Sequence, residues 1–187
     1  AMGALAAAVG QRDPFTAGHQ KRVAHLAVAI AEHMKLPANQ IEGLQLAAEV
    51  HDVGQIRIPA EILTRPRQLL PVEFALLREH AEAGYQILKD VPLPWPVAEI
   101  VRQHHENYDG SGYPAGLKGD AIRLEARIIR ICDAMEAMMS HRPFRPALPR
   151  DTAIAELENG AGSNFDPAIV THCIALFREA RYEFPRP

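Results

Sequence analysis

The dipeptide His51-Asp52, at the end of a predicted helix, is the feature that most constrains how this chain can fold. Apolar residues such as Leu44 and Val50 precede it at helical spacing, and Gly54 follows at a position typical of a helix stop. An imidazole beside a carboxylate is costly to bury unless each has a partner. Two interpretations are open for the dipeptide alone. Either neighbouring polar groups satisfy it, or the carboxylate bridges two metal ions and the imidazole binds one of them.

Further imidazoles project from the apolar faces of other predicted helices. In the segment 17–34, His19 lies on the face that carries the apolar residues, and His80 does so in the segment 72–89. A single inward histidine is usually a hydrogen-bonded core residue. Together with His51, however, these residues place imidazoles on three successive helices, which indicates a common site. Three other histidines are expected to lie outside it: His25, His33 and His172.

The remaining segments also have helical patterns, and the sequence therefore predicts an all-α fold. With 187 residues, of which 48% are hydrophobic and 23% charged, the chain suits one globular domain with a proper core. The predicted helices cover about 4–9, 17–34, 37–52, 60–63, 72–89, 96–104, 122–139, 152–159 and 166–182.

Charge and cysteine content exclude several classes of protein. A net charge of -3 with a pI near 6.3 argues against binding to a nucleic-acid polymer, so an anionic substrate needs local cations. Cys132 and Cys173 lie in apolar segments, form no metal-ligand pattern and suit a reducing compartment. Without a signal peptide or an apolar run long enough to span a bilayer, the fragment is expected to be cytoplasmic and not to insert into a membrane.

Three more features of the sequence lie in the second half of the chain: a pair of histidines, a glycine-rich loop and an aspartate in an apolar segment. His104-His105 ends a predicted helix, and residues 109–119 follow as a loop whose four glycines can use positive φ. Taken alone, this loop is a plain interhelical connection. Asp133 lies in the segment 122–139, which is apolar on most sides, and its carboxylate therefore needs a cation as partner.

The order of these motifs resembles the HD-GYP family of bacterial cyclic di-GMP phosphodiesterases, a branch of the HD metal-dependent phosphohydrolases. The resemblance covers nearly the whole chain and implies an all-α, HD-domain-type helical bundle with a GYP loop and additional C-terminal helices. It implies a phosphodiesterase domain over 11–187, and a linker helix over 1–10 from an N-terminal sensory or receiver domain missing from this sequence. The segments that carry it are 12–19, His51-Asp52, His104-His105, Gly112-Tyr113-Pro114, 142–145 and Phe165-Asp166-Pro167.

The candidate metal ligands are five imidazoles and two carboxylates. Without a thiolate, this set suits two divalent transition-metal ions, with iron or manganese preferred and zinc, nickel or cobalt as alternatives. Asp52 is the expected bridge, and two ions roughly 3.5–4 Å apart activate a water molecule and hold a phosphate. Phe15 stands where some relatives have a glutamate for a third metal, so two ions are expected. The candidate ligands are His19, His51, Asp52, His80, His104, His105 and Asp133.

The candidate substrate contacts are cationic or aromatic. Arg142 and Arg145 can form forked contacts with phosphate oxygens, unless they are ordinary solvated loop residues. Lys118 is a weaker candidate of the same kind. Tyr113 would stack on a guanine or brace the loop. The resemblance also implies that the GYP loop is a docking surface for diguanylate cyclase domains.

Gln55 departs from the family pattern, because most members have a lysine at this position. The change removes a positive charge expected beside the substrate phosphate. Restoring a lysine is predicted to increase turnover, unless Arg57 or another cation already fills the role. Two functions are thus weighed: hydrolysis of cyclic di-GMP to pGpG or onward to GMP, or a weakly active or inactive module that binds cyclic di-GMP and partner proteins.

Overall fold

The computed structural model describes residues 14–64, 68–142 and 145–186, with side chains placed from residue 18 onward. Within these ranges the regular elements are all helices, which confirms the all-α prediction. No helix in them is long and apolar enough to cross a membrane. The predicted helix over 4–9 lies outside the described residues. The elements are α2 (Pro14–His33), α3 (Ala38–Val50), η1 (Val53–Arg57), α4 (Ala60–Leu63), α5 (Pro71–Leu88), α6 (Val97–Gln103), η2 (Gly119–Ala121), α7 (Leu124–Met139), α8 (Arg150–Asn159) and α9 (Pro167–Arg178).

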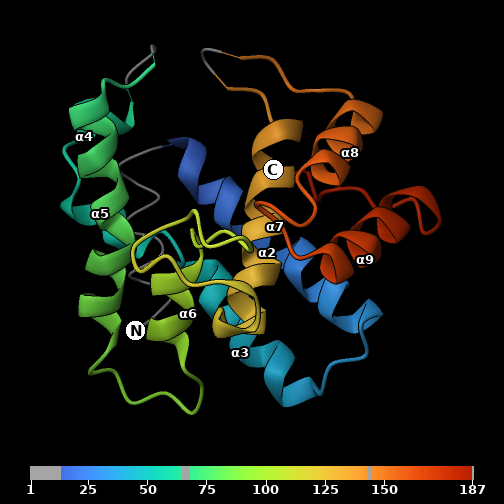
Figure 1. The fold of residues 1–187 in the computed structure, drawn as a ribbon, viewed down its shortest axis with the longest axis horizontal. Helices are drawn as coiled ribbons and strands as arrows, with labels where there is room; N and C mark the ends of the chain where they lie inside the picture. Colours follow the sequence, from blue (N-terminus) through green and yellow to red (C-terminus); the bar gives the residue numbers. More distant parts are fainter. Residues whose placement is uncertain (1–13, 65–67, 143–144, 187) are drawn as a thin grey trace.

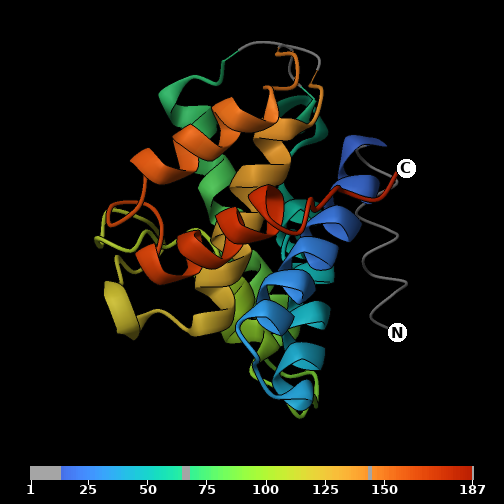
Figure 2. The same ribbon diagram turned by 90° about the vertical axis from the view of Figure 1, so that its right-hand side faces the viewer.

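Helix α7 lies at the centre of the bundle. Figure 1 shows it between α5 and α6 on one side and α8 and α9 on the other. Helices α2 and α3 lie side by side (Figure 2), and α2 also packs against α7 and α9. Helix α7 is covered on most sides, as the apolar pattern of its sequence predicted, and its polar residues Asp133 and Glu136 therefore lie in the interior.

The core consists of apolar, mostly aliphatic side chains from α2, α3, α6, α7, α8 and α9. Leu26 and Ile30 of α2, Ile129 and Met135 of α7 and Phe177 of α9 have no exposed surface. Burying each such side chain contributes roughly 1.5–3 kcal/mol. The two cysteines, Cys132 and Cys173, belong to the same core as free thiols.

The segment after α3 differs from the prediction. Helix α3 ends at Val50, and Gly54 lies inside the 3-10 helix η1, without a positive φ. A Cβ at Gly54 would lie 1.8 Å from the carbonyl oxygen of His80 and 2.6 Å from the amide nitrogen of Gly84. The predicted role of Gly54 as a helix stop is therefore wrong. A glycine is needed because η1 lies against α5, and this contact brings Asp52 next to His80.

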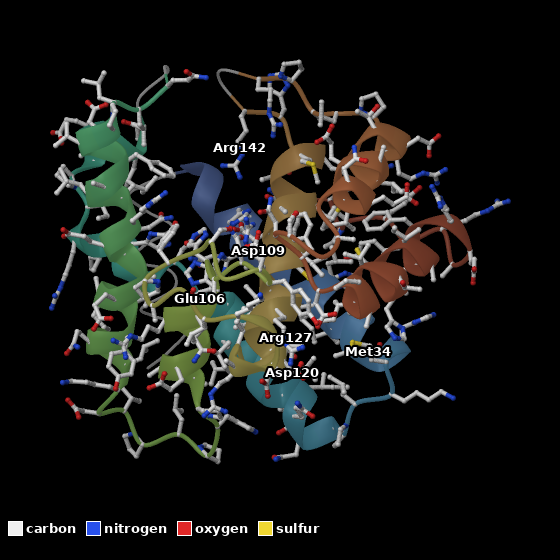
Figure 3. The ribbon with its side chains drawn as sticks, viewed as in Figure 1. Met34, Glu106, Asp109, Asp120, Arg127 and Arg142 are labelled. Atoms are coloured by element: carbon white, nitrogen blue, oxygen red, sulfur yellow. The ribbon has the colours of Figure 1, made fainter. Side chains whose placement is uncertain are left out.

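The GYP loop, defined as residues 109–119, is held in place from both sides. Positive φ angles occur at Gly110, Gly116 and Gly119, as its glycine content predicted. The buried carboxylate of Glu106 accepts hydrogen bonds from the amides of Ala115, at 2.7 Å, and Leu117, at 3.0 Å. Tyr108 and Asp109, at the start of the loop, bond to the carbonyls of Asn164 and Ser163. The loop is thereby fixed to the C-terminal segment (Figure 3).

Candidate metal centre and substrate cavity

Five separate segments bring the predicted ligands together. α2 supplies His19, the junction between α3 and η1 supplies His51 and Asp52, and α5 supplies His80. His104 and His105 directly follow α6, and α7 supplies Asp133. The nitrogens and oxygens available for ligation fall into clusters in which they lie within 4.8 Å of one another. The clusters are His19, His51 and Asp133; His80, His104 and His105; and His51, Asp52 and His104.

The carboxylate of Asp52 lies between the first two clusters. Its Oδ2 atom is 3.3 Å from Nε2 of His51 and 3.7 Å from Nε2 of His19. Its Oδ1 atom is 3.5 Å from Nε2 of His80 and 3.8 Å from Nε2 of His104. Each oxygen of this carboxylate therefore faces a different cluster, which is the arrangement that a bridging ligand requires.

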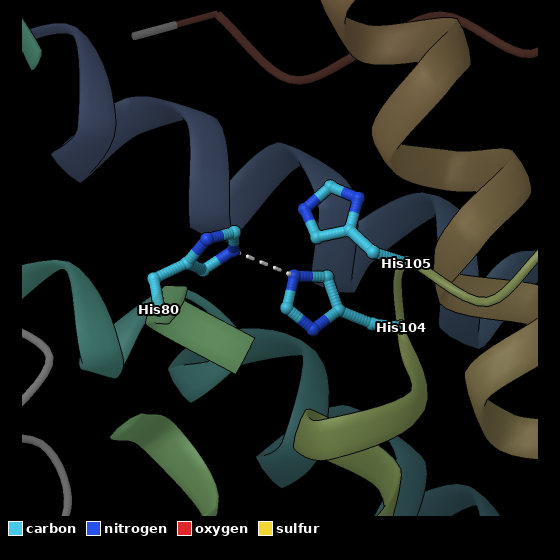
Figure 4. A group of neighbouring side chains, drawn as sticks. All are labelled: His80, His104 and His105. Atoms are coloured by element: carbon cyan, nitrogen blue, oxygen red, sulfur yellow. Dashed lines mark hydrogen bonds between the residues drawn. The ribbon is translucent and has the colours of Figure 1, made fainter. Parts of the chain in front are cut away.

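Asp133 completes the first cluster from α7. Its Oδ1 atom lies 3.0 Å from Nε2 of His19 and 4.0 Å from Nε2 of His51. In the second cluster, the rings of His80, His104 and His105 converge from two chain segments (Figure 4), with neighbouring ring centres 4.2–5.2 Å apart. Each cluster thus offers three side chains in addition to one oxygen of Asp52.

Backbone hydrogen bonds set the orientation of three imidazoles. In each ring Nδ1 donates a proton to the carbonyl oxygen three residues earlier, so in the neutral ring Nε2 carries the lone pair. This tautomer turns the ligand nitrogen towards Asp52. The pairs are His51 with Ala48 at 2.6 Å, His80 with Leu77 at 2.6 Å, and His104 with Val101 at 2.5 Å.

The resulting lone pairs fit a bound cation. The Nε2 atoms of His80 and His104 lie 3.3 Å apart (Figure 4), although both rings have their Nδ1 proton engaged elsewhere. The Nε2 atom of His51 is buried and has no hydrogen-bond partner within the described ranges. A metal ion accepts lone pairs from such nitrogens and removes their mutual repulsion, so the residues present fit a transition-metal centre.

The electrostatics favour the ligand forms of two carboxylates, Asp52 and Asp133, and two imidazoles, His104 and His105. Burial alone would raise the pKa of Asp52, but His51 and the other imidazoles outweigh it and hold the pKa well below its usual range. Asp133 behaves in the same way beside His19. Burial lowers the pKa of His104 and brings that of His105 to about 3. Burial would lower the pKa of His19 and His51 as well, but the neighbouring carboxylates outweigh it and raise the pKa of His19 to about 10 and that of His51 above its usual value. Ionised carboxylates and neutral imidazoles are the forms that bind metal.

Glu136 is part of the site and was not predicted. It lies one helical turn after Asp133 on α7, has no exposed surface, and accepts a short hydrogen bond from Nδ1 of His19. Burial would raise its pKa, but this hydrogen bond and its other partners lower the pKa to about 2. Its spacing from Asp133 was the only signal in the sequence. The other donors are Arg22 at 2.6 and 2.8 Å, Ser140 at 2.5 Å and Arg142 at 3.5 Å.

A cavity of about 760 Å³ opens above the two clusters. Gln55, Tyr113 and Arg142 line it, so these three candidates lie where a substrate would bind. The Tyr113 ring stacks on His105, with ring centres 4.9 Å apart and planes inclined by 17°. Figure 3 shows Arg142 extending inward from the segment after α7. The walls of the cavity also contain Arg78 and Arg130, which were not among the predicted substrate contacts.

Two of the predicted cations, Arg145 and Lys118, do not line this cavity. Arg145 uses its Nη2 atom to donate to the carbonyl oxygen of Ala137, at 2.7 Å, and so caps α7. Lys118 is exposed, next to Leu117, whose amide is bound by Glu106. Neither lines the cavity, and neither does Arg57, which is also exposed. None of these three residues is part of the cavity wall, and a contact of Arg145 or Lys118 with substrate stays a prediction.

The histidines expected outside the site lie elsewhere. His25 is exposed, and its Nδ1 lies 2.6 Å from the hydroxyl of Tyr182. Nδ1 of His33 lies 2.8 Å from Nδ1 of His172, which pairs α2 with α9 at the surface. The side chain of Phe15 lies outside the described residues, so the expectation of two rather than three ions stays a prediction.

Comparison with known proteins places this chain in a family. The HD domain family matches residues 4–169. The chain therefore belongs to the HD domain family. It is 39% identical over 168 residues to the cyclic di-GMP phosphodiesterase response regulator RpfG of Xanthomonas campestris, covering 89% of this chain and 44% of that protein. It is 38% identical over 170 residues to a cyclic di-GMP phosphodiesterase of Thermotoga maritima, covering 90% and 46%.

These names agree with the resemblance to the HD-GYP branch, and the chain spans less than half the length of either relative. A third relative, the 3'3'-cGAMP-specific phosphodiesterase 3 of Vibrio cholerae, is 35% identical, covering 92% of this chain and 36% of its own length. Among solved structures, an HDG"Y"P protein from Bdellovibrio bacteriovorus has a TM-score of 0.72 at 22% identity, covering 87% and 54%. The HD domain of L. monocytogenes PgpH, solved with cyclic-di-AMP, has a TM-score of 0.61 at 20% identity, covering 98% and 99%. These two structures share the fold.

Proposed function

We propose that this domain is a metal-dependent phosphodiesterase that hydrolyses cyclic di-GMP to linear pGpG, with GMP as the product of a second hydrolysis. The observation that carries the proposal is the position of Asp52, whose two oxygens face two separate three-ligand clusters at the base of a cavity. The choice of cyclic di-GMP as substrate rests on the names of the relatives from Xanthomonas campestris and Thermotoga maritima, both of which are cyclic di-GMP phosphodiesterases.

The ligand clusters support an assignment to two ions, which the sequence left open. One ion would bind His19, His51 and Asp133 together with Oδ2 of Asp52. The other would bind the second cluster together with Oδ1 of Asp52. Iron or manganese suits this set, with zinc, nickel or cobalt as alternatives. When bound, such a pair lowers the pKa of a water molecule and neutralises part of the phosphate charge.

The chain's own residues orient the substrate for hydrolysis. Arg142 would hold a phosphate oxygen at the cavity wall, and the Tyr113 ring would stack on a guanine while bracing His105. The oxygen of a water molecule forms a bond to phosphorus as the bond from phosphorus to the 3′ oxygen breaks. The 3′ oxygen takes up one proton, and the new phosphomonoester releases the other to solvent. Opening one ring bond gives pGpG, and cleaving the remaining phosphodiester gives two GMP molecules.

The outer face of the GYP loop would be the surface for diguanylate cyclase domains. Pro114, Ala115 and Gly116 are exposed, while Glu106 holds the backbone of the loop rigid from beneath. A fixed, exposed loop loses little conformational entropy on binding a partner.

A binding module is the second candidate function, and one observation favours it. Gln55, which lines the cavity, is uncharged where most family members are expected to have a lysine. In that case cyclic di-GMP would bind without turnover, and the GYP loop would pass the signal to a partner.

One assay separates the two functions. Protein with a measured metal content is incubated with cyclic di-GMP, and the products are followed by chromatography. Hydrolysis predicts pGpG from the parent and none from Asp52→Ala, which should also lose bound metal because the bridge is gone. Asp109→Ala, which removes an exposed carboxylate of the loop, is the matched control and should behave like the parent. Recovery of intact cyclic di-GMP bound to fully metallated parent would favour the binding module.

A further inference from the structure

Arg130 is a cation of the cavity wall without an ionic partner. It lies on α7 one turn before Asp133, is partly buried, and donates from Nε to Oδ1 of Asn107 at 3.1 Å. The centre of the Phe165 ring lies 5.3 Å from its guanidinium carbon. In the described part of the chain, no carboxylate forms an ion pair with it and its two terminal nitrogens donate no hydrogen bond. These nitrogens are available to a ligand.

The position of Arg130 is costly unless an anion binds there. Burial lowers the pKa of Arg130, and the charge of Asp133, which lies beyond ion-pair distance, offsets this only in part. The charge of Arg130 acts on His105 and Tyr113, so it lies close to the predicted ligands, where it also repels metal ions. Partly desolvated charges without a partner cost free energy. One turn earlier on the same helix, Arg127 avoids this cost because Nη1 lies 2.6 Å from a carboxylate oxygen of Asp166. An anionic ligand in the cavity would pair with the Arg130 guanidinium as Asp166 pairs with Arg127.

The two other arginines of the cavity wall are less suited to this role. Arg142 lies 3.5 Å from Glu136, which already neutralises part of its charge. Arg78 is exposed, and its guanidinium carbon lies 4.7 Å and 5.0 Å from the ring centres of Phe74 and Tyr113. Both can contact the outer parts of a dinucleotide. Among the described cations of the cavity wall, only Arg130 is partly buried and also has no carboxylate within ion-pair distance.

We propose that Arg130 supplies the fixed positive charge for the reacting phosphate that Gln55 cannot supply. The inference rests on the proposed function for the identity of the anion. As water oxygen bonds to phosphorus and the 3′ oxygen leaves, negative charge increases on the non-bridging oxygens. A charge held in place before the reaction stabilises that state more than the bound substrate. Gln55 lines the same cavity, so a lysine there could reach the same anion.

Binding is measured first, so that the test does not depend on activity. Metal-loaded parent, Arg130→Gln and Arg57→Gln are titrated calorimetrically with a phosphorothioate analogue of cyclic di-GMP. Arg130→Gln should weaken binding about tenfold or more, the loss typical of one charge-assisted contact. Arg57→Gln removes the same charge from an exposed site two residues after Gln55 and should leave the affinity unchanged. The metal content of Arg130→Gln should not fall, because the substitution removes a repelling charge, whereas a merely structural role predicts a loss.

Rescue by a second charge is the decisive step. Gln55→Lys should restore binding and single-turnover rate in the Arg130→Gln protein, yet change the parent rate by less than about threefold, because the parent already has its cation. If Arg130→Gln does not fold, Gln55→Lys alone decides. A gain of about tenfold in the parent, corresponding to ~1.4 kcal/mol, would show that the charge was missing and would overturn the inference.

The outcomes separate this inference from the proposed function. A parent that shows the binding pattern but forms no product disproves hydrolysis and leaves Arg130 as the phosphate-binding cation. A parent that hydrolyses cyclic di-GMP, with Arg130→Gln equal to Arg57→Gln in affinity and rate, overturns the assignment of Arg130 alone. A metal-loaded parent that binds no analogue overturns both.

Discussion

The imidazole of His19 on α2 donates its Nδ1 proton to the carboxylate of Glu136 on α7, 117 residues further along the chain. This bond fixes the ring so that Nε2 points at Asp133 and Asp52. A carboxylate behind a metal-binding histidine sets the orientation of the ring and increases its basicity as a ligand. The orientation of a ligand in the first metal cluster therefore depends on Glu136, a residue that does not line the cavity.

Glu136→Gln should lower the metal affinity of the first cluster about 10–100-fold, because an amide orients His19 less firmly and donates no charge. Titration of the apoprotein with Mn²⁺ measures this loss, with one of the two binding steps expected to weaken. Glu158→Gln is the control and should leave both steps unchanged, since the Glu158 carboxylate pairs with Arg178 at the surface. Equal affinities for Glu136→Gln and the parent would contradict the orienting role of Glu136.

Gly54→Ala should lose both stability and metal. The added Cβ would collide with the His80 carbonyl and push α5 away from η1, which separates His80 from Asp52. Overpacking of this kind costs typically 1–3 kcal/mol. Thermal unfolding and elemental analysis measure the two effects. In the control, Gly43→Ala, the collision is with the Trp95 ring, so stability should fall while metal content stays at the parent level.

Glu106→Ala should loosen the GYP loop, because the amides of Ala115 and Leu117 lose their acceptor. Each lost hydrogen bond to a charged acceptor costs up to about 1.5–3 kcal/mol. Hydrogen exchange at these two amides should become faster, and the KM for cyclic di-GMP should rise as Tyr113 loses its fixed position. Asp109→Ala removes an exposed acceptor for Ser111 and should change exchange only locally. Unchanged protection at both amides would refute the anchoring role.

Arg142→Ala and Arg145→Ala should differ, although the sequence analysis treated the two residues alike. Arg142 lines the cavity, and its loss should weaken cyclic di-GMP binding by about 1.5–3 kcal/mol, the range of a charge-assisted contact. Arg145 caps α7 through Ala137 and should affect stability rather than affinity. Calorimetric titration and thermal unfolding of both variants check this. Weaker binding by Arg145→Ala at unchanged stability would restore the original assignment of Arg145.

The sequence by itself determined the helical class, the position of nearly every described helix and the residues with ligand chemistry. These features are local: an apolar period of 3.6 defines a helix, and an imidazole on its apolar face is visible without knowing what packs against it. His19, His51 and His80 were recognisable on three successive helices for this reason. The order of short motifs then indicated the family.

Only the tertiary structure decided how those residues are used. Which oxygen of Asp52 faces which cluster depends on the contact between η1 and α5, and this contact depends on Gly54. Glu136 and Arg130 carry no motif, since their roles come from side chains far away in the chain. Arg142 and Arg145 are alike in sequence, and their roles separate only because one guanidinium faces the cavity and the other caps a helix. Helical periodicity gives the face of a residue, whereas partners and direction come from long-range packing.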